Sequence, residues 1–91
     1  FTGQTVYFMV PGSQNWVSVT VTLSNSVVTN ASANYWAPTA FSTRLMSRAV
    51  PILNSETVSA NSASISSVGG ASLVSTAYKT SLQDALLKSG R

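Results

Sequence analysis

Neither cysteine nor histidine occurs in this chain of 91 residues, and its acidic side chains are limited to Glu56 and Asp84. Without cysteine the chain cannot form disulfides or thiolate–zinc sites. Without histidine it has no imidazole to act as a general base or to activate a serine nucleophile. With only two carboxylates, neither a metal cage nor a catalytic carboxylate pair is expected. The composition therefore argues against an independent hydrolytic enzyme.

Charged side chains of either sign are scarce, at 8% of the residues, where about 25% is typical of globular domains. The five cations, Arg44, Arg48, Lys79, Lys88 and Arg91, give a formal net charge of +3 but are scattered along the chain. They form no basic stripe that could follow a nucleic-acid backbone, so nucleic acid is not an expected partner. Because few charges repel neighbouring copies, the composition favours self-association.

Long apolar runs are also missing. No run approaches the roughly 20 residues that a membrane-spanning helix needs, so we expect no transmembrane segment. The first residue is Phe rather than Met, which is compatible both with removal of a signal or anchor and with a chain cut from a longer one. A surface rich in serine and threonine, poor in charge and free of cysteine suits the outside of a bacterial cell. We therefore expect an extracytoplasmic location, at the cell surface, in the periplasm or secreted.

The first half of the chain carries β-type patterns. Residues 5–10 form a β-branched and aromatic run, and the Pro-Gly-Ser sequence at 11–13 predicts a turn after it. From Trp16 to Leu23 apolar and hydroxyl side chains alternate strictly, which indicates a half-buried strand. A short turn at 24–26 then leads into a returning strand over 27–33.

Tyr35, Trp36 and Pro38 follow as an aromatic connection. Two interpretations of the rings remain open. Both rings cap one end of the hydrophobic core, or one of them forms the wall of a site for a planar ligand.

The second half of the chain has helical periodicity. We expect a helix over 41–58, capped by Thr39 or Ser42, with a kink or a restart at Pro51 because proline lacks the amide hydrogen. Its predicted buried face comprises Phe41, Leu45, Ala49, Ile52 and Leu53.

A connection over 61–67 should lead into a short strand around Ile65. The last helix is predicted over 73–88, with Gly90 as its C-terminal stop. Its predicted buried positions are Ala77, Tyr78, Ser81, Leu82, Ala85 and Leu86. The order of elements predicts an α+β fold over a single domain, residues 1–91. We expect a small antiparallel sheet, made of an N-terminal hairpin plus added strands, packed by two helices.

A run of small residues, Gly69-Gly70-Ala71-Ser72, stands directly before the last helix. Backbone amides at a helix N-terminus point outward and carry the positive end of the helix dipole, so they attract anions such as phosphate. Glycines let a ligand approach the backbone closely. By itself such a loop is a weak signal, since most are only turns and caps.

The segments that carry a family resemblance include this loop and lie in one order along the chain: Ser47–Leu53, Ser59–Ala63, Val68–Ser75, Ala77-Tyr78, and Ser81-Leu82-Gln83 with Ala85-Leu86. In order and spacing they resemble the bacterial FMN-binding domain, whose pattern reads approximately SRAIPIL, a spacer, then DAVSGATYTSxAYxxSLQxAL. This module occurs in extracytoplasmic electron-transfer proteins and in subunits of sodium-pumping and related redox complexes. The match covers about half of the chain.

The resemblance implies that FMN is carried on Ser72 through a phosphoester bond, because Ser72 occupies the position of the family's attachment hydroxyl. It also implies the neighbouring cofactor-binding residues, which are Gly69, Gly70, Ala71, Leu73 and Ser75. The dipole of the following helix would add about 0.3–1 kcal/mol for an exposed phosphate charge.

Several motif positions depart from the family pattern. Ser66 stands where the family has Asp, Gly69 where it has Ser, Ser72 where it has the attachment Thr, and Val74 where it has a second Thr. An alternative interpretation therefore stays open, in which Ser72 is only a helix N-cap and the flavin has been lost. Arg48 likewise either pairs with a phosphate or lies in solvent or against Glu56.

Two functions are consistent with these patterns. The first is an FMN-carrying electron-transfer module of an exported or membrane-associated bacterial redox protein, with redox proteins as partners. The second is a flavin-free structural module that self-assembles, as a homo-oligomer or filament, at the cell surface.

Overall fold

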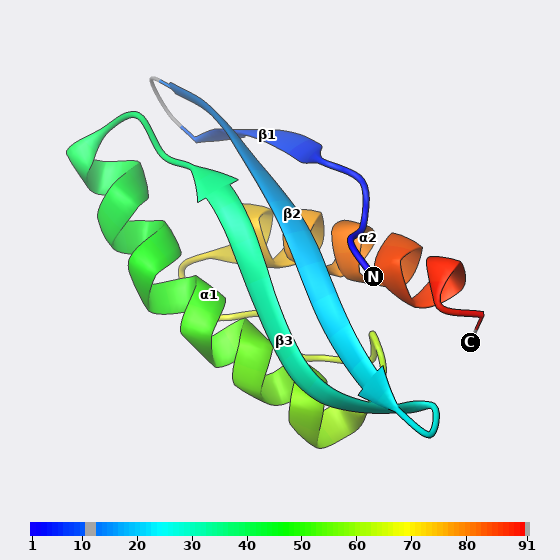
Figure 1. Ribbon diagram of the computed structural model, residues 1–91. Coiled ribbons are helices and arrows are strands. Elements are labelled where there is room, and N and C mark those ends of the chain that lie inside the picture. Colours follow the sequence, from blue (N-terminus) through cyan, green and yellow to red (C-terminus); the bar gives the residue numbers. More distant parts are fainter. Residues whose placement is uncertain (11–12, 91) are drawn as a thin grey trace.

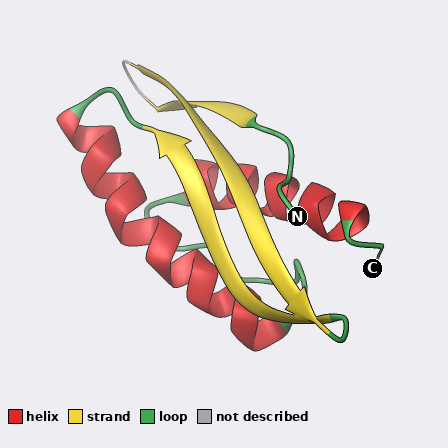
Figure 2. Ribbon diagram, in the orientation of Figure 1, coloured by secondary structure: helices red, strands yellow, loops and turns green. Residues whose placement is uncertain are grey.

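The computed structural model describes residues 1–10 and 13–90. It shows a three-stranded antiparallel sheet with both helices on one of its faces (Figure 1). The elements are β1 (Val6–Val10), β2 (Ser13–Ser24), β3 (Val27–Trp36), α1 (Ala40–Ala60) and α2 (Ser72–Lys88). Figure 2 shows the two-layer arrangement, with the strands in front of the helices. The predicted α+β fold is confirmed.

The central strand β2 pairs with β1 on one side and β3 on the other. Its alternation is as predicted, because Val17, Val19 and Val21 are almost completely buried against the helices. Burying each such side chain stabilises the fold by about 1.5–3 kcal/mol. The opposite set of side chains on β2 faces away from the helices, so one face of the sheet forms the core and the other stays uncovered.

The hairpin between β2 and β3 has a two-residue turn. Asn25 and Ser26 both have positive φ, at 52° and 66°, as a type I′ turn requires. The pairing shifts register between Thr22 and Leu23, so β3 carries a bulge. The other predicted turn, at 11–13, falls mainly on residues 11 and 12, which lie outside the described residues.

The expected aromatic connection at 35–36 is wrong in one respect, since β3 continues to Trp36. Because neighbouring residues of a strand point to opposite faces, the two rings lie on opposite faces of the sheet. Tyr35 packs against the core, as predicted. Trp36 is 55% exposed on the outer face and does not cap the core.

Helix α1 begins with a capping box in which Thr39 and Ser42 bond reciprocally. It runs through Pro51 without a break, so the expected restart is wrong. Pro51 and Ser47, whose carbonyl loses its helical partner, are both exposed, and water can satisfy that carbonyl. The buried stripe is Ser42, Met46, Ala49, Val50, Leu53 and Thr57. Phe41 and Ile52 are exposed, which corrects the predicted face by part of a turn.

The segment between the helices contains no strand among its described residues 61–71, so the short strand expected around Ile65 is wrong. Ile65 is nevertheless buried in the core. The amide of Ser66 donates to Glu56 Oε1 at 3.2 Å rather than to a neighbouring strand. An apolar side chain anchored in a loop gives the same local pattern as a short strand.

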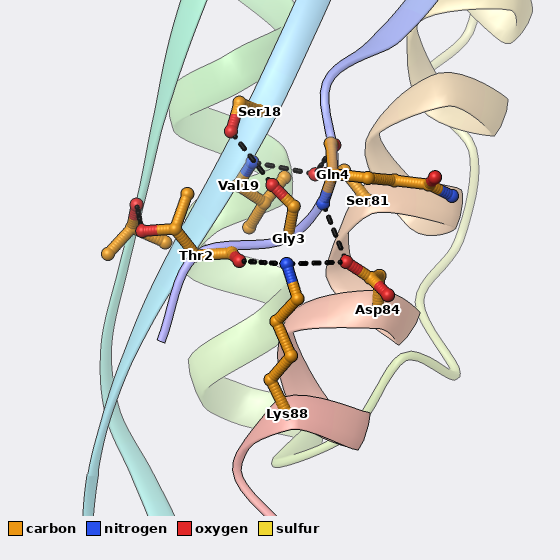
Figure 3. Close-up of polar contacts among 9 residues, drawn as sticks. Thr2, Gly3, Gln4, Ser18, Val19, Ser81, Asp84 and Lys88 are labelled. Atoms are coloured by element: carbon orange, nitrogen blue, oxygen red, sulfur yellow. Dashed lines mark hydrogen bonds and ion pairs between the residues drawn. The ribbon is translucent and has the colours of Figure 1, made fainter.

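Helix α2 buries all six of its predicted positions. It also holds the segment before β1 against the sheet (Figure 3). The amide of Gly3 donates to the carbonyl of Val19 at 2.8 Å, which extends the edge of the sheet. The buried hydroxyl of Ser81 also links this segment to β2. It accepts a hydrogen bond from the amide of Val19 and donates one to the carbonyl of Gln4, both at 2.8 Å.

Two charged side chains of α2 bind the same segment from its exposed side (Figure 3). Asp84 accepts a hydrogen bond from the amide of Gln4 at 2.7 Å. Lys88 donates to the carbonyl of Thr2 at 3.0 Å and lies 3.1 Å from the Asp84 carboxylate. Positions 81, 84 and 88 share one helix face, so a single face of α2 fixes residues 2–4.

Candidate functional site

The loop before α2 is fixed by its own hydrogen bonds. The hydroxyl of Ser75 accepts from the amide of Val68 at 2.9 Å and donates to the carbonyl of Ala71 at 2.8 Å. The amide of Ala71 donates to the carbonyl of Val68 at 3.0 Å, closing a turn. Gly70 lies inside that turn with a φ of +78°, a conformation that L side chains rarely adopt.

Arg48 reaches this loop from α1. Its Nη2 donates to the carbonyl of Gly69 at 3.0 Å, and a Cβ added at Gly70 would lie 3.3 Å from the same nitrogen. The alternative in which Arg48 pairs with Glu56 is wrong, because Glu56 Oε1 accepts from the amide of Ser66 instead. One guanidinium nitrogen is thus used to hold the glycine loop in place.

Helix α2 starts at Ser72, with Ala71 as its N-cap, and no side chain accepts a hydrogen bond there. Ser72 is therefore the first helical residue, and the alternative in which it caps the helix is wrong. Its side chain is exposed. Helix α1 has a capping box made by Thr39 and Ser42, whereas no side chain caps the first turn of α2.

A cavity of about 340 Å³ opens beside the loop. It is lined by Phe41, Arg44, Leu45, Arg48 and Gly70. Two arginines, one aromatic side chain, one aliphatic side chain and a glycine therefore line the same cavity. Its volume lies at the lower end of the range typical of small-molecule sites. Arginines of this kind attract planar or phosphorylated anions.

Neither acid of the chain lines this cavity. Glu56 accepts a backbone hydrogen bond, and Asp84 pairs with Lys88 on the far half of α2. The positive charge of the two arginines is thus not neutralised within the cavity, which favours an anionic occupant.

The six sequence-predicted site residues lie in one short segment, residues 69–75, but their environments in the structure differ. Gly69, Gly70, Ser72 and Leu73 are exposed, and only Gly70 lines the cavity. Ala71 and Ser75 are buried, and the Ser75 hydroxyl already makes two hydrogen bonds within the loop. Ser75 therefore holds the loop in shape, whereas Ser72 leaves its hydroxyl open to solvent.

Sequence reasoning missed three cavity residues, Phe41, Arg44 and Leu45. Phe41 and Leu45 were assigned to the core, yet Phe41 is 54% exposed. A signal was present: positions 41, 44, 45 and 48 follow helical i, i+3, i+4, i+7 spacing and combine an aromatic ring with two arginines. A stripe of mixed apolar and cationic side chains is atypical of a core face and fits a ligand-facing one.

A scan against models of known protein families matches none of them, and a search of curated proteins finds no relative of this chain. The resemblance to FMN-binding domains thus remains a prediction from the motif residues. Within residues 1–10 and 13–90, neither helix combines the length and apolar character needed to cross a bilayer. Over the same residues, no three His, Cys, Asp or Glu side chains gather where they could hold a metal ion.

Proposed function

We propose that this protein is an FMN-carrying electron-transfer module of an exported or membrane-associated bacterial redox protein. The observation that supports it best is the junction of the arginine-lined cavity with the glycine loop. Gly70 lines the cavity, Arg48 binds the loop, and α2 begins two residues later with no side-chain cap. An anionic group at Ser72 would lie at a helix N-terminus that no side chain caps, at the positive end of the α2 dipole.

The residues present fit FMN. The cavity offers an aromatic and an aliphatic side chain for a planar ring and two guanidinium groups for negative charge. Gly69 and Gly70 carry no Cβ that would obstruct a phosphate, and Ser72 supplies an exposed hydroxyl for a phosphoester. Bound FMN would supply reversible one- and two-electron transfer, which needs no catalytic side chain from the protein. The chain's own task is to bind, orient and partly shield the group for redox-protein partners.

The intact mass and the visible spectrum of protein isolated from its native host test this proposal. We expect flavin absorption bands and a mass higher than the bare polypeptide by one FMN phosphoester. Ser72→Ala should lose the added mass, whereas Ser67→Ala, at another exposed loop serine, should keep it. Native protein that is colourless, has the bare mass and does not bind added FMN would rule the proposal out.

A second function, a flavin-free module that self-assembles, is supported by the edges of the sheet. β1 and β3 are the outer strands of the described sheet, and none of the residues in either strand is charged. On β3 the amide of Val28 is already bonded, because it donates to Asn61 Oδ1 at 2.8 Å. Proteins that avoid edge-to-edge pairing usually place lysine or proline on such strands. The ten-residue strand β3 is the longer template for a second copy.

Sedimentation velocity over a range of concentrations tests self-assembly. If β3 edges pair, Ser32→Lys should keep the protein monomeric under conditions where the wild type associates. Ser55→Lys, on the exposed side of α1, adds the same charge away from the edge and should leave association unchanged. A wild type that remains monomeric at every concentration excludes this function.

A further inference from the structure

The uncovered face of the sheet carries three aromatic side chains in a row, one from each strand. In the register, Tyr7 of β1 is opposite Trp16 of β2, and Trp16 is opposite Trp36 of β3. Residues opposite each other in an antiparallel sheet point to the same face. Their neighbours Val17 and Tyr35 pack on the helices, so this aromatic row points away from them.

The aromatic row is accessible. Tyr7 is 62% exposed, Trp36 is 55% exposed, and Trp16 between them is half-buried. Met9, two residues along β1, adds an exposed apolar side chain beside Tyr7. A cluster of large aromatic side chains left in solvent is characteristic of a binding surface rather than of a core. None of these residues lines the arginine-containing cavity, so the two surfaces are distinct.

The absence of charged side chains on the strands limits the class of ligand that the outer face of the sheet would bind. All seven Asp, Glu, Lys and Arg side chains of the chain lie at residue 44 or later, so the three strands contain no charged side chain. Platforms for single-stranded nucleic acid combine stacked rings with a cationic groove, and membrane-binding surfaces combine rings with lysine and arginine. An uncharged face matches an uncharged ligand.

The groups beside the aromatic row are amides. Gln14 and Asn34 are both exposed and stand on the outer face, one on each side of the row along the strands. Each amide offers donors and an acceptor that suit hydroxyl groups. Toward the β2–β3 turn the face is mainly small and polar, as at Ser32, so the apolar part is limited to the aromatic row and Met9 beside it. A face-to-face dimer would need a broader apolar surface.

The spacing of the row suits a chain of linked sugars. Adjacent strands lie about 4.8 Å apart, so three ring-bearing positions extend over roughly 10 Å across the sheet. The spacing between adjacent strands is close to the length of one pyranose unit in a β-linked chain, so the row matches about two units. The C–H faces of the sugars would pack on the aromatic rings, and their hydroxyls would bond to the flanking amides. We propose that the aromatic row of Tyr7, Trp16 and Trp36 is a binding platform for a neutral polysaccharide.

The test measures binding of the purified protein to insoluble cellulose, chitin and a soluble mixed-linkage β-glucan, by pull-down and by tryptophan fluorescence. We expect saturable binding to at least one, with an emission shift. Trp36→Ala and Tyr7→Ala should each weaken it tenfold or more, and Trp36→Tyr should retain most of it. Leu87→Ala, at an exposed apolar side chain on α2, is the matched control and should bind as the wild type does.

Three results would overturn the proposal. The first is the absence of binding to all three glycans at millimolar sugar-unit concentrations with a folded wild type. The second is binding to phosphatidylcholine–phosphatidylglycerol vesicles, and not to glycans, that Trp36→Ala removes. The third is glycan binding that Tyr7→Ala and Trp36→Ala leave unchanged. Because both substituted side chains are largely exposed, circular dichroism should show an intact fold in each variant.

Discussion

At Gly3 the chain passes so close to α2 that any side chain there would overlap the helix backbone. A Cβ built on Gly3 would collide with the carbonyl group of Ser81. The close approach lets the Ser81 hydroxyl reach both Val19 and Gln4. Gly69 presents the opposite case, since a Cβ there meets nothing within 4 Å.

We expect Gly3→Ala to lower the free energy of unfolding by about 1–3 kcal/mol, because the methyl group must displace the segment from α2. Gly69→Ala should be neutral or slightly stabilising, since it restricts the unfolded chain without a clash. Urea unfolding of both variants measures the difference. Equal stabilities would show that the close approach is not rigid.

Ser81→Ala should cost about 1–3 kcal/mol, because it leaves the buried amide of Val19 and the carbonyl of Gln4 without their partner. The control is Thr80→Ala, which removes an exposed hydroxyl bonded to the carbonyl of Thr76 and should change stability by less than about 0.5 kcal/mol. Chemical unfolding and hydrogen exchange at Val19 report on the change. A fast-exchanging Val19 amide in the wild type would contradict the role given to Ser81.

Among single residues, the sequence predicted the glycine stop and the helix cap correctly. Gly90 has a φ of +87° at the end of α2, and Thr39 caps α1. Those roles depend on local backbone chemistry, which the sequence carries. The roles of Gly3 and Ser81 depend on contacts 77 residues apart. Helical periodicity placed Ser81 on the buried face of α2, but no local pattern identifies its hydrogen-bond partners.

At the scale of elements, the two helices are joined by a buried tyrosine. The hydroxyl of Tyr78 on α2 donates to Asn54 Oδ1 on α1 at 2.6 Å. Burial raises the pKa of Tyr78 from 10.0 to about 12, against a smaller lowering by the hydrogen bond with Thr57. The folded protein therefore favours the neutral phenol more strongly than the unfolded chain does.

The raised pKa predicts a loss of stability in alkali. The contribution of the neutral phenol is fully present below pH 10 and disappears as the pH rises through about 12. Wild type should exceed Tyr78→Phe in stability at pH 9, and the gap should close between pH 10 and 12. Urea midpoints measured for both proteins at each pH provide the test. A gap independent of pH would contradict it.

The contact between α2 and residues 2–4 gives stability the opposite dependence on pH. Hydrogen bonds from Lys88 and from the amide of Gln4 lower the pKa of Asp84 below its ordinary value of 3.8. Stability from these bonds is present above pH 3.8 and is lost as the pH falls through the lowered value. Asp84→Asn should thus be less stable than wild type at pH 6 and equal to it in strong acid. Lys88→Ala should raise the Asp84 pKa in an NMR titration; an unchanged value would contradict the assigned cause.

Periodicity predicted the elements well where a single face decides burial. The alternation of β2 and the buried face of α2 are as expected. Periodicity predicted the wrong environment where a large apolar side chain lies on the surface instead of in the core. Phe41 was expected inside but lines the cavity, and Trp36, which one of two interpretations put at the end of the core, lies exposed in the aromatic row. The cavity itself needs α1 and the glycine loop side by side, which no single segment encodes.

At the scale of the whole molecule, charge and aromatic surface are divided between the layers. Every Asp, Glu, Lys and Arg side chain follows residue 43, on the helices and the segments around them, and the strands have none. The helical layer therefore has the arginine-lined cavity, and the outer sheet face has the aromatic row. An anionic cofactor and a neutral polymer would meet opposite sides of the protein and would not compete.

Ligand binding to a protein of this size should be visible in its melting temperature. Added FMN at one hundred times its dissociation constant should stabilise the fold by about 2.7 kcal/mol. Riboflavin has the same ring without the phosphate and should give a smaller shift, because it cannot use the α2 N-terminus. Arg48→Gln should reduce the FMN shift more than the riboflavin shift. Equal shifts in melting temperature for both ligands in the wild type would contradict binding of the phosphate at the N-terminus of α2.

Residues 2–4 are held on α2 by Ser81, Asp84 and Lys88, and this contact also bears on the order in which the protein folds. Its hydrogen bonds join residues 77, 80 and 86 positions apart, so they close almost the longest loops the chain allows. Contacts of such separation form late in folding. The first residues bond to β2 at much shorter separation, through the amide of Gly3 with the carbonyl of Val19 and the amide of Val21 with the carbonyl of Phe1. That pairing can therefore form first, and the docking of α2 onto it is the step that completes the fold.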